Sequence, residues 1–203
     1  FLQSILAGKR MQAVAVINVG LVHEIPILDL YVHIIQESLY QVGKLWEENK
    51  ISVAAEHLAT AVTQFVLAQT YGHLKFPKQN KGNLILTGVQ NELHQVGSNM
   101  VADVLESHGW NVHFLGSNLP SSSILDAIHN HHANVVGIST TMVFNIPQTK
   151  DLIRQIRQAT TQNPPKIIVG GAAYRFDSYL WKKMGADYYA SDVKETVLLL
   201  ASM

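Results

Sequence analysis

The later part of the chain alternates short apolar runs with helical patterns, and this alternation limits the possible folds more than any other feature. The apolar runs lie at residues 84–86, 112–114, 135–138, 167–169 and 188–189. Helical spacing follows each run, at about 96–108, 121–132, 147–161, 176–184 and 192–202. Strand followed by helix, five times in succession, predicts an α/β fold with a five-stranded parallel sheet and flanking helices. Such sheets bind ligands at the carboxyl ends of their strands, beside the point where strand order reverses.

Residues 1 to about 75 have a helical rhythm throughout. Apolar spacing predicts helical stretches over about 2–21, with breaks near Gly8 and Gly20, and over about 27–48 and 53–71. Four helical segments with short connections predict an N-terminal four-helix bundle. The polar, helix-breaking residues 76–82 then indicate a linker. The predicted domains are therefore a bundle at 1–75, the linker at 76–82 and a flavodoxin-like or Rossmann-like domain at 83–203.

Charge balance and the absence of cysteine exclude several functions. Fifteen Lys and Arg balance fifteen Asp and Glu, so we expect no direct nucleic-acid binding and no attraction to a membrane surface. No apolar run reaches the ~20 residues that span a bilayer. Zero cysteines exclude disulfides, thiolate metal sites and thiol nucleophiles, and they favour a cytoplasmic location. The chain opens at Phe1 without a signal peptide or an initiating Met, which predicts a piece of a longer protein.

The loop after the first predicted strand contains one imidazole close to a carboxylate. It has neither the G-x-G-x-x-G pattern of dinucleotide sites nor a phosphate-binding P-loop. A neutral imidazole at His94 is a good transition-metal ligand, and Glu92 on its other N–H would fix the tautomer. Gly97 would let the backbone approach a bulky ligand. On this loop alone, an exposed histidine without a function is the alternative.

The segment Glu92-Leu93-His94-Gln95-Val96-Gly97 resembles the D-x-H-x-x-G signature of cobalamin-binding domains. In that family the histidine displaces the cofactor's own base and ligates cobalt. The resemblance therefore implies cobalamin as the cofactor and His94 as the cobalt ligand. It covers about residues 82–203 and departs from the signature by Glu92 in place of Asp.

Three further marks of the same family follow the ends of successive predicted strands. The family's L-G-x-x-x-P pattern is matched at residues 115–120, which include Leu119. Ser139, Thr140 and Thr141 stand where the family's serine contacts the buried nucleotide tail of the cofactor. Gly170 and Gly171 stand where two glycines pass that tail closely. The resemblance implies that these residues bind the cofactor.

The bundle carries a second resemblance. Trp46, followed by Glu56 and His57, is similar to the W-x9-E-H motif of the CarH-like cobalamin photoreceptors, whose bundle covers the upper face of the corrin ring. An indole there would exclude water from a light-sensitive cobalt–carbon bond, and the other two side chains would hydrogen-bond an upper ligand. Glu56 and His57 point about 100° apart on a helix, so they cannot face one ligand equally. A core tryptophan with a surface Glu-His pair is the alternative.

These resemblances predict a light-sensing regulatory domain that is not itself an enzyme. Adenosylcobalamin or another upper-ligand form would be bound, and light would change bundle packing and homo-oligomeric assembly to control an output domain. Glu47 departs from the light-sensing repressors, which have a histidine directly after the tryptophan. The related photocobilins add a bilin such as biliverdin, which this chain would have to hold without a thioether link.

Two other functions fit parts of the sequence. A corrinoid methyl-carrier subunit of a methyltransferase system is the main alternative. A corrin-free response-regulator-like domain is disfavoured, because the first strand ends in Gly88-Val89-Gln90 without an acidic residue for phosphoryl transfer. The remaining histidines of the later part of the chain are expected at the end of the sheet remote from the ligand, where they complement a helix dipole or lie in a turn: His108, His113, His129, His131 and His132.

Overall fold

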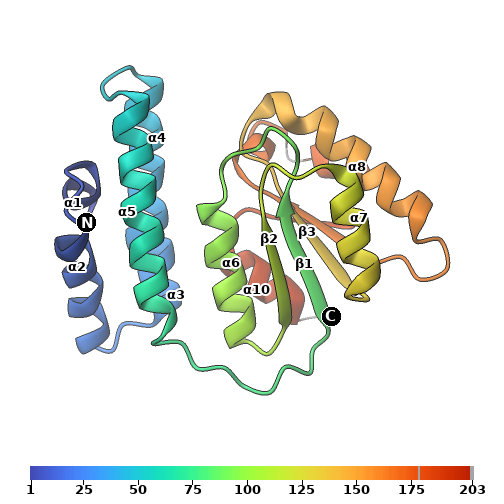
Figure 1. Cartoon of the computed structure of the whole chain (residues 1–203), viewed down its shortest axis with the longest axis horizontal. Helices are drawn as coiled ribbons and strands as arrows, with labels where there is room; N and C mark the ends of the chain where they lie inside the picture. Colours follow the sequence, from blue (N-terminus) through green and yellow to red (C-terminus); the bar gives the residue numbers. More distant parts are fainter. Residues whose placement is uncertain (178, 202–203) are drawn as a thin grey trace. The chain divides into compact units, whose positions relative to one another are not determined.

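The structure, a computed structural model, describes residues 1–177 and 179–201 (Figure 1). The chain divides into two compact units, Phe1–Lys75 and Phe76–Met203. Positions 178 and 202, at which helices were predicted, lie outside the described residues.

The first unit is helical, as the sequence predicts, although one helix continues through Gly20, where a break was predicted. Gly20 is buried there, and a Cβ atom on it would lie 2.5 Å from the Leu30 side chain, so close packing explains this glycine. Its elements are α1 (Leu2–Leu6), α2 (Arg10–Val22), α3 (Ile27–Leu30), η1 (Tyr31–Gln36), α4 (Glu37–Glu47) and α5 (Val53–Tyr71). Ser52 is the N-cap of α5, since its side chain accepts a hydrogen bond from the Ala55 N–H at 3.2 Å. The apolar stripe of α5 that faces the bundle core includes Val62, Val66 and Leu67, all fully buried.

The element η1 is a π-helical segment that joins α3 to α4 without a break. The sequence predicts one regular helix over 27–48, because a short π-helical stretch leaves no mark in an apolar pattern of period 3.6. Tyr31 and Ile35 of η1 are fully buried. The wider turn therefore keeps both side chains in the bundle core.

The second unit has a sheet of five parallel strands within its described residues, in the order β2-β1-β3-β4-β5. The strands are β1 (Asn83–Gly88), β2 (Asn111–Gly116), β3 (Val135–Ser139), β4 (Lys166–Gly170) and β5 (Tyr188–Ala190). The α-helices are α6 (Val96–Ser107), α7 (Ser121–Asn130), α8 (Ile146–Ala159), α9 (Leu180–Met184) and α10 (Val193–Ala201). The predicted α/β fold is confirmed, and strand order reverses between β1 and β3.

Helices cover both faces of the sheet (Figure 1). Side chains of α7 and α8 pack with Ile85, Val136 and Val169 in one apolar cluster. Side chains of α6 and α10 pack with Leu84, Leu86 and neighbouring strand residues in a second cluster on the other face. Because both faces are buried, the strands are apolar runs without alternation.

Two short 3-10 helices were not predicted: η2 (Val143–Asn145) after β3 and η3 (Ala172–Tyr174) after β4. Each has only three residues, too few for a periodic pattern. Both follow a strand at its carboxyl end and so belong to the edge where a ligand site is expected. Among the described residues, no helix combines the length and apolarity that crossing a membrane requires.

Candidate functional site

The reversal of strand order brings two loops together at the carboxyl edge of the sheet. Strand β1 pairs with β3 so that Gly88 lies beside Ser139. The loop that follows β1 contains Glu92 and His94, and the loop that follows β3 leads into η2. Residues 92–97, which are predicted to bind a cofactor, therefore lie at the topological switch point.

Glu92 joins these two loops through both of its carboxylate oxygens. Its side chain is fully buried. Oε1 accepts hydrogen bonds from the backbone N–H of His94 at 3.1 Å and from His94 Nδ1 at 2.6 Å. Oε2 accepts from the backbone N–H groups of Thr141 and Met142, at 2.9 and 3.1 Å, and from Nδ2 of Asn145 at 3.1 Å. The contact between carboxylate and imidazole that the sequence predicts is therefore present.

This surrounding sets the charge of Glu92. Burial alone would raise the pKa of the carboxyl group, but the hydrogen bonds from His94, Met142, Asn145 and Thr141 outweigh it and lower the pKa from 4.5 to about 2. The carboxylate is therefore ionised at neutral pH. It provides a fixed negative charge beneath the imidazole.

His94 is oriented by Glu92 while its side chain remains 48% exposed. Because Glu92 engages Nδ1, Nε2 is the ring nitrogen that a metal would take. Within the described residues no group of three or more His, Cys, Asp or Glu side chains is arranged to hold a metal. One imidazole suits an ion whose other ligands come from a macrocycle.

The start of α6 is open to its surroundings at Gly97. A Cβ atom built on Gly97 would meet no heavy atom within 4 Å, and the backbone there is not in the left-handed region. Leu93 is 68% exposed beside His94. Gln95 is half-buried and Val96 buried, so these two fasten the loop to the domain. The surface at Gly97 is therefore open, as the close approach of a bulky ligand requires.

The residues expected around the nucleotide tail have different surroundings. Leu119, Ser139 and Thr141 are half-buried at the strand ends, whereas Thr140 is fully buried and its Oγ1 lies 2.8 Å from Oγ1 of Thr149. The Thr140 side chain is thus part of the protein interior.

The two glycines after β4 have an internal reason for lacking side chains. A Cβ on Gly171, whose φ is 106°, would lie 2.3 Å from the Thr140 carbonyl oxygen, and one on Gly170 would lie 2.9 Å from that of Ala190. Close packing of this chain's own backbone is therefore sufficient to explain why both residues are glycine. The predicted passage of a ligand would be a second, separate reason.

In the first unit, the motif residues lie on the surface of α4 and α5. Trp46 is 38% exposed, so it is not the core tryptophan of the alternative interpretation. Nδ1 of His57 lies 2.5 Å from Oε2 of Glu56, and the His57 side chain is 70% exposed. Glu56 is half-buried and also accepts a hydrogen bond from Thr60. Trp46 and His57 are thus accessible to a ligand.

The sequence did not predict the role of Asn145. This side chain is fully buried, and its Nδ2 donates to Glu92 and to the Asn91 carbonyl oxygen, the latter at 3.3 Å. The residue follows β3 in η2, 53 positions from Glu92 in sequence. No local pattern links the two positions, because Asn145 lies six residues beyond the end of β3.

Four of the remaining histidines of the second unit form ring pairs. The rings of His113 and His131 stack at 3.8 Å, and those of His129 and His132 meet edge to face at 6.5 Å. Burial and the neighbouring His131 lower the pKa of His113. His129, His131 and His132 are exposed, and none of them contacts Glu92 or His94 through a hydrogen bond or ring contact reported for the described residues.

Two family models together match most of the chain. A family model described as "B12 binding domain" matches residues 82–198, and a second model with the same description matches residues 1–70. The chain is 26% identical to dimethylamine corrinoid protein 3 of Methanosarcina acetivorans over 176 residues, which cover 86% of this chain and 81% of that protein.

Two solved structures resemble the fold. The monomethylamine corrinoid protein of Methanosarcina barkeri superposes with a TM-score of 0.85 at 18% identity, over 100% of this chain and 96% of that one. The methanol:cobalamin methyltransferase complex MtaBC from the same organism gives a TM-score of 0.53 at 16% identity, over 100% of this chain and 78% of the matched chain.

Proposed function

Because the chain belongs to the B12 binding domain family, we propose that it is the corrinoid-carrying subunit of a methyl-transfer system, with His94 as the lower ligand of cobalt. The cofactor is a cobalamin or related corrinoid. In this proposal the chain presents the cofactor to separate methyltransferases and does not itself catalyse the reaction. Its partners are then methyltransferase proteins.

The names of the similar proteins support a carrier more than a light sensor. The relative with 26% identity is a dimethylamine corrinoid protein, and the match extends over both units of the chain. A structure with the same fold was solved as part of a methyltransferase complex. The carrier function, which the sequence offered as the alternative, is therefore our preferred one.

The single observation that carries the proposal is the contact between His94 Nδ1 and the buried Glu92 carboxylate at 2.6 Å. The contact fixes the tautomer with the proton on Nδ1 and directs Nε2 to the metal. The ionised carboxylate raises the basicity of the imidazole. Bound corrinoid supplies a cobalt centre that accepts and releases methyl groups.

We further propose that the first unit supplies the cover for the upper face of the cofactor. Trp46 offers a flat apolar surface and His57 a hydrogen-bonding group, and both side chains are exposed. Such a cover would exclude water from a reactive cobalt centre between encounters with partners. Replacing Trp46 by alanine should then speed oxidation of the reduced, cofactor-loaded protein in air.

The proposed ligand can be tested by electron paramagnetic resonance. Protein loaded with cobalamin and reduced to Co(II) should show the three-line splitting of one axial nitrogen, because nitrogen-14 has three spin states. Labelling the protein's histidines with nitrogen-15 should convert three lines into two, which separates a protein imidazole from the cofactor's own base. The variant His94→Ala should lose the effect of labelling, while His129→Ala, as the matched control, should keep it. A wild-type spectrum that labelling leaves unchanged would refute the assignment.

Light sensing is the second candidate, and the W-x9-E-H pattern with its paired Glu56 and His57 favours it. In that case adenosylcobalamin would be the bound form, with or without a bilin, and an output domain would respond. Illumination of protein loaded in the dark with adenosylcobalamin separates the two functions. A carrier keeps its sedimentation coefficient after photolysis, whereas a sensor changes its assembly.

A further inference from the structure

One face of α2 carries apolar side chains that the first unit leaves exposed. Met11, Val19 and Val22 are 69%, 59% and 79% exposed. The buried residues of the helix are Ala13, Val14, Ile17 and Gly20. Between residues 11 and 22 the sequence has no charged side chain. A helix that is apolar all round is normally covered all round, so the exposed face of α2 has the character of an interface.

The exposed side chains form a stripe with symmetric spacing. Met11, Ala15, Asn18 and Val22 are exposed and follow one another at intervals of four, three and four residues. Reversing the helix leaves these intervals unchanged, so an antiparallel copy of α2 would place Met11 opposite Val22 and Ala15 opposite Asn18. Such spacing is typical of the seam between two packed helices.

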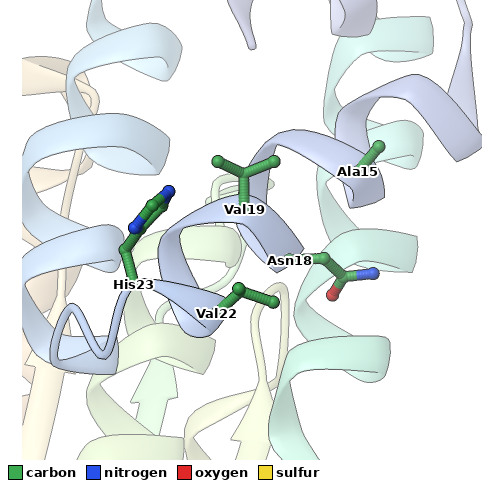
Figure 2. Close-up of a pocket in the computed structure, with 5 residues that line it drawn as sticks. All are labelled: Ala15, Asn18, Val19, Val22 and His23. Carbon is green, nitrogen blue, oxygen red and sulfur yellow. The ribbon is translucent and has the colours of Figure 1, made fainter.

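A shallow pocket on the same face can receive a side chain from an opposing helix. Ala15, Asn18, Val19, Val22 and His23 line it, and all of them belong to α2 or its C-cap (Figure 2). In the antiparallel arrangement, Met11 of a second copy lies at the Val22 end of this pocket. Methionine is flexible and fills irregular apolar spaces well.

The charges at the ends of α2 favour the same arrangement. Lys9, the N-cap, and Arg10 place positive charge at the positive end of the helix dipole, while Glu24 follows the negative end. The charged side chains at both ends therefore interact unfavourably with the dipole of α2. Lys9 and Glu24 are exposed, and neither has an ion-pair partner among the described residues. In an antiparallel pair, Lys9 of each copy lies at the same level along the helix axis as Glu24 of the other.

We propose that two copies of this chain associate through antiparallel α2 helices, with Met11 of one copy packed against Val22 of the other. The stripe from Met11 to Val22 is about 16 Å long at 1.5 Å per residue. A helix pair of this length buries less than the roughly 1,600 Å² of a standard interface. The dimer is therefore weak and reversible, with dissociation in the micromolar range or above.

Sedimentation of the full chain over a concentration series tests the association. The wild type should pass from monomer to dimer as concentration rises, and Val22→Asp should stay monomeric with an unchanged circular dichroism spectrum. Lys9→Glu alone and Glu24→Lys alone should each weaken dimerisation by about fivefold or more, because two ion pairs become repulsive in each dimer. The double variant Lys9→Glu/Glu24→Lys should regain wild-type association.

Engineered cysteines test the direction of the helices, since the natural chain has no cysteine. Oxidation of the double variant Met11→Cys/Val22→Cys should give a covalent dimer. Met11→Cys alone should not, because an antiparallel pair holds the two copies of position 11 far apart. Within one copy, positions 11 and 22 are about 16 Å apart and cannot form a disulfide.

Three results would overturn the pairing. The first is a chain that stays monomeric at every concentration and yields no covalent dimer. The second is cross-linking of Met11→Cys alone as readily as the double variant, which indicates parallel helices. The third is a monomeric wild type in which Val22→Asp instead abolishes binding of a methyltransferase, which assigns this face to that partner.

Discussion

The Oε2 atom of Glu92 accepts a hydrogen bond from the backbone N–H of Thr141 at 2.9 Å. This contact ties the loop after β1 to the loop after β3, on the two sides of the point where strand order reverses. The opposite oxygen of the same carboxylate holds the imidazole of His94. One buried side chain thus orients the proposed metal ligand and stabilises the edge of the sheet that carries it.

The first prediction concerns the charge of Glu92. Glu92→Gln keeps the size of the side chain but replaces one accepting oxygen by an NH₂ group, so at least one buried donor of the network loses its partner. We expect the free energy of unfolding to fall by about 1–3 kcal/mol. Because the imidazole loses its carboxylate, cofactor affinity should fall about 10- to 100-fold. Denaturant titration and cofactor titration by absorbance measure the two effects.

Glu92→Asp is the matched comparison, since aspartate stands at this position in the signature that the loop resembles. The shorter side chain keeps its charge but cannot span both loops from the same backbone. We expect it to bind cofactor better than Glu92→Gln and to be less stable than the wild type. Equal cofactor affinity of the two variants would show that the charge of Glu92 has no role.

The second prediction follows from the lowered pKa of Glu92. The pKa in the folded protein, about 2, lies below the ordinary value of 4.5. The carboxylate therefore contributes stability that is present above about pH 4.5 and is lost as the pH falls towards 2. This difference corresponds to roughly 3 kcal/mol at most. The gap in unfolding free energy between the wild type and Glu92→Gln should shrink between pH 5 and pH 2. A gap that stays constant between pH 5 and pH 2 would contradict a lowered pKa of Glu92.

The apolar patterns were sufficient to predict the strands and the order of elements. Strands β1, β3 and β4 are buried on both faces, so each leaves a continuous apolar run in the sequence. The match of Glu92 and His94 to a known signature predicts the site that we propose. That prediction needs only local sequence, because the signature lies within one loop.

Contacts between distant positions were beyond local patterns. Glu92 and Thr141 are 49 residues apart, and the bond uses a backbone N–H that every non-proline residue possesses. Asn145 lies in a three-residue 3-10 helix without periodicity. The π-helical turn at Tyr31–Gln36 also left no signal, because the side chains that it buries suit an ordinary helix as well.

The third prediction contrasts two glycines of the proposed site. A side chain at Gly97 would enter vacant space at the start of α6. Gly97→Leu should therefore fold with unchanged or slightly higher stability, since glycine costs a helix about 0.5–1 kcal/mol. The added side chain would occupy the space assigned to the corrin ring, so cofactor uptake should be lost.

Gly171→Ala, in contrast to Gly97→Leu, should lower the stability of the protein. The positive φ of 106° and the close approach of the Thr140 carbonyl oxygen both oppose a Cβ atom there. We expect a loss of more than about 2 kcal/mol in stability. Thermal unfolding without cofactor, followed by cofactor titration, separates the two variants. Normal uptake by Gly97→Leu would show that the corrin ring lies elsewhere.

The fourth prediction concerns Asn145, which donates a hydrogen bond to Glu92 from a fully buried position. Asn145→Ala removes this donor and should cost about 1–3 kcal/mol. Asn145→Asp places a second carboxylate against the first, so at neutral pH it should be less stable than Asn145→Ala despite its nearly native shape. Acidification to about pH 5 should narrow this difference, because a buried acid beside a like charge has a raised pKa and takes up a proton there. Asn163→Asp, at an exposed position, is the control and should behave like the wild type. If Asn145→Asp were as stable as the wild type at neutral pH, Glu92 could not be ionised in the folded protein.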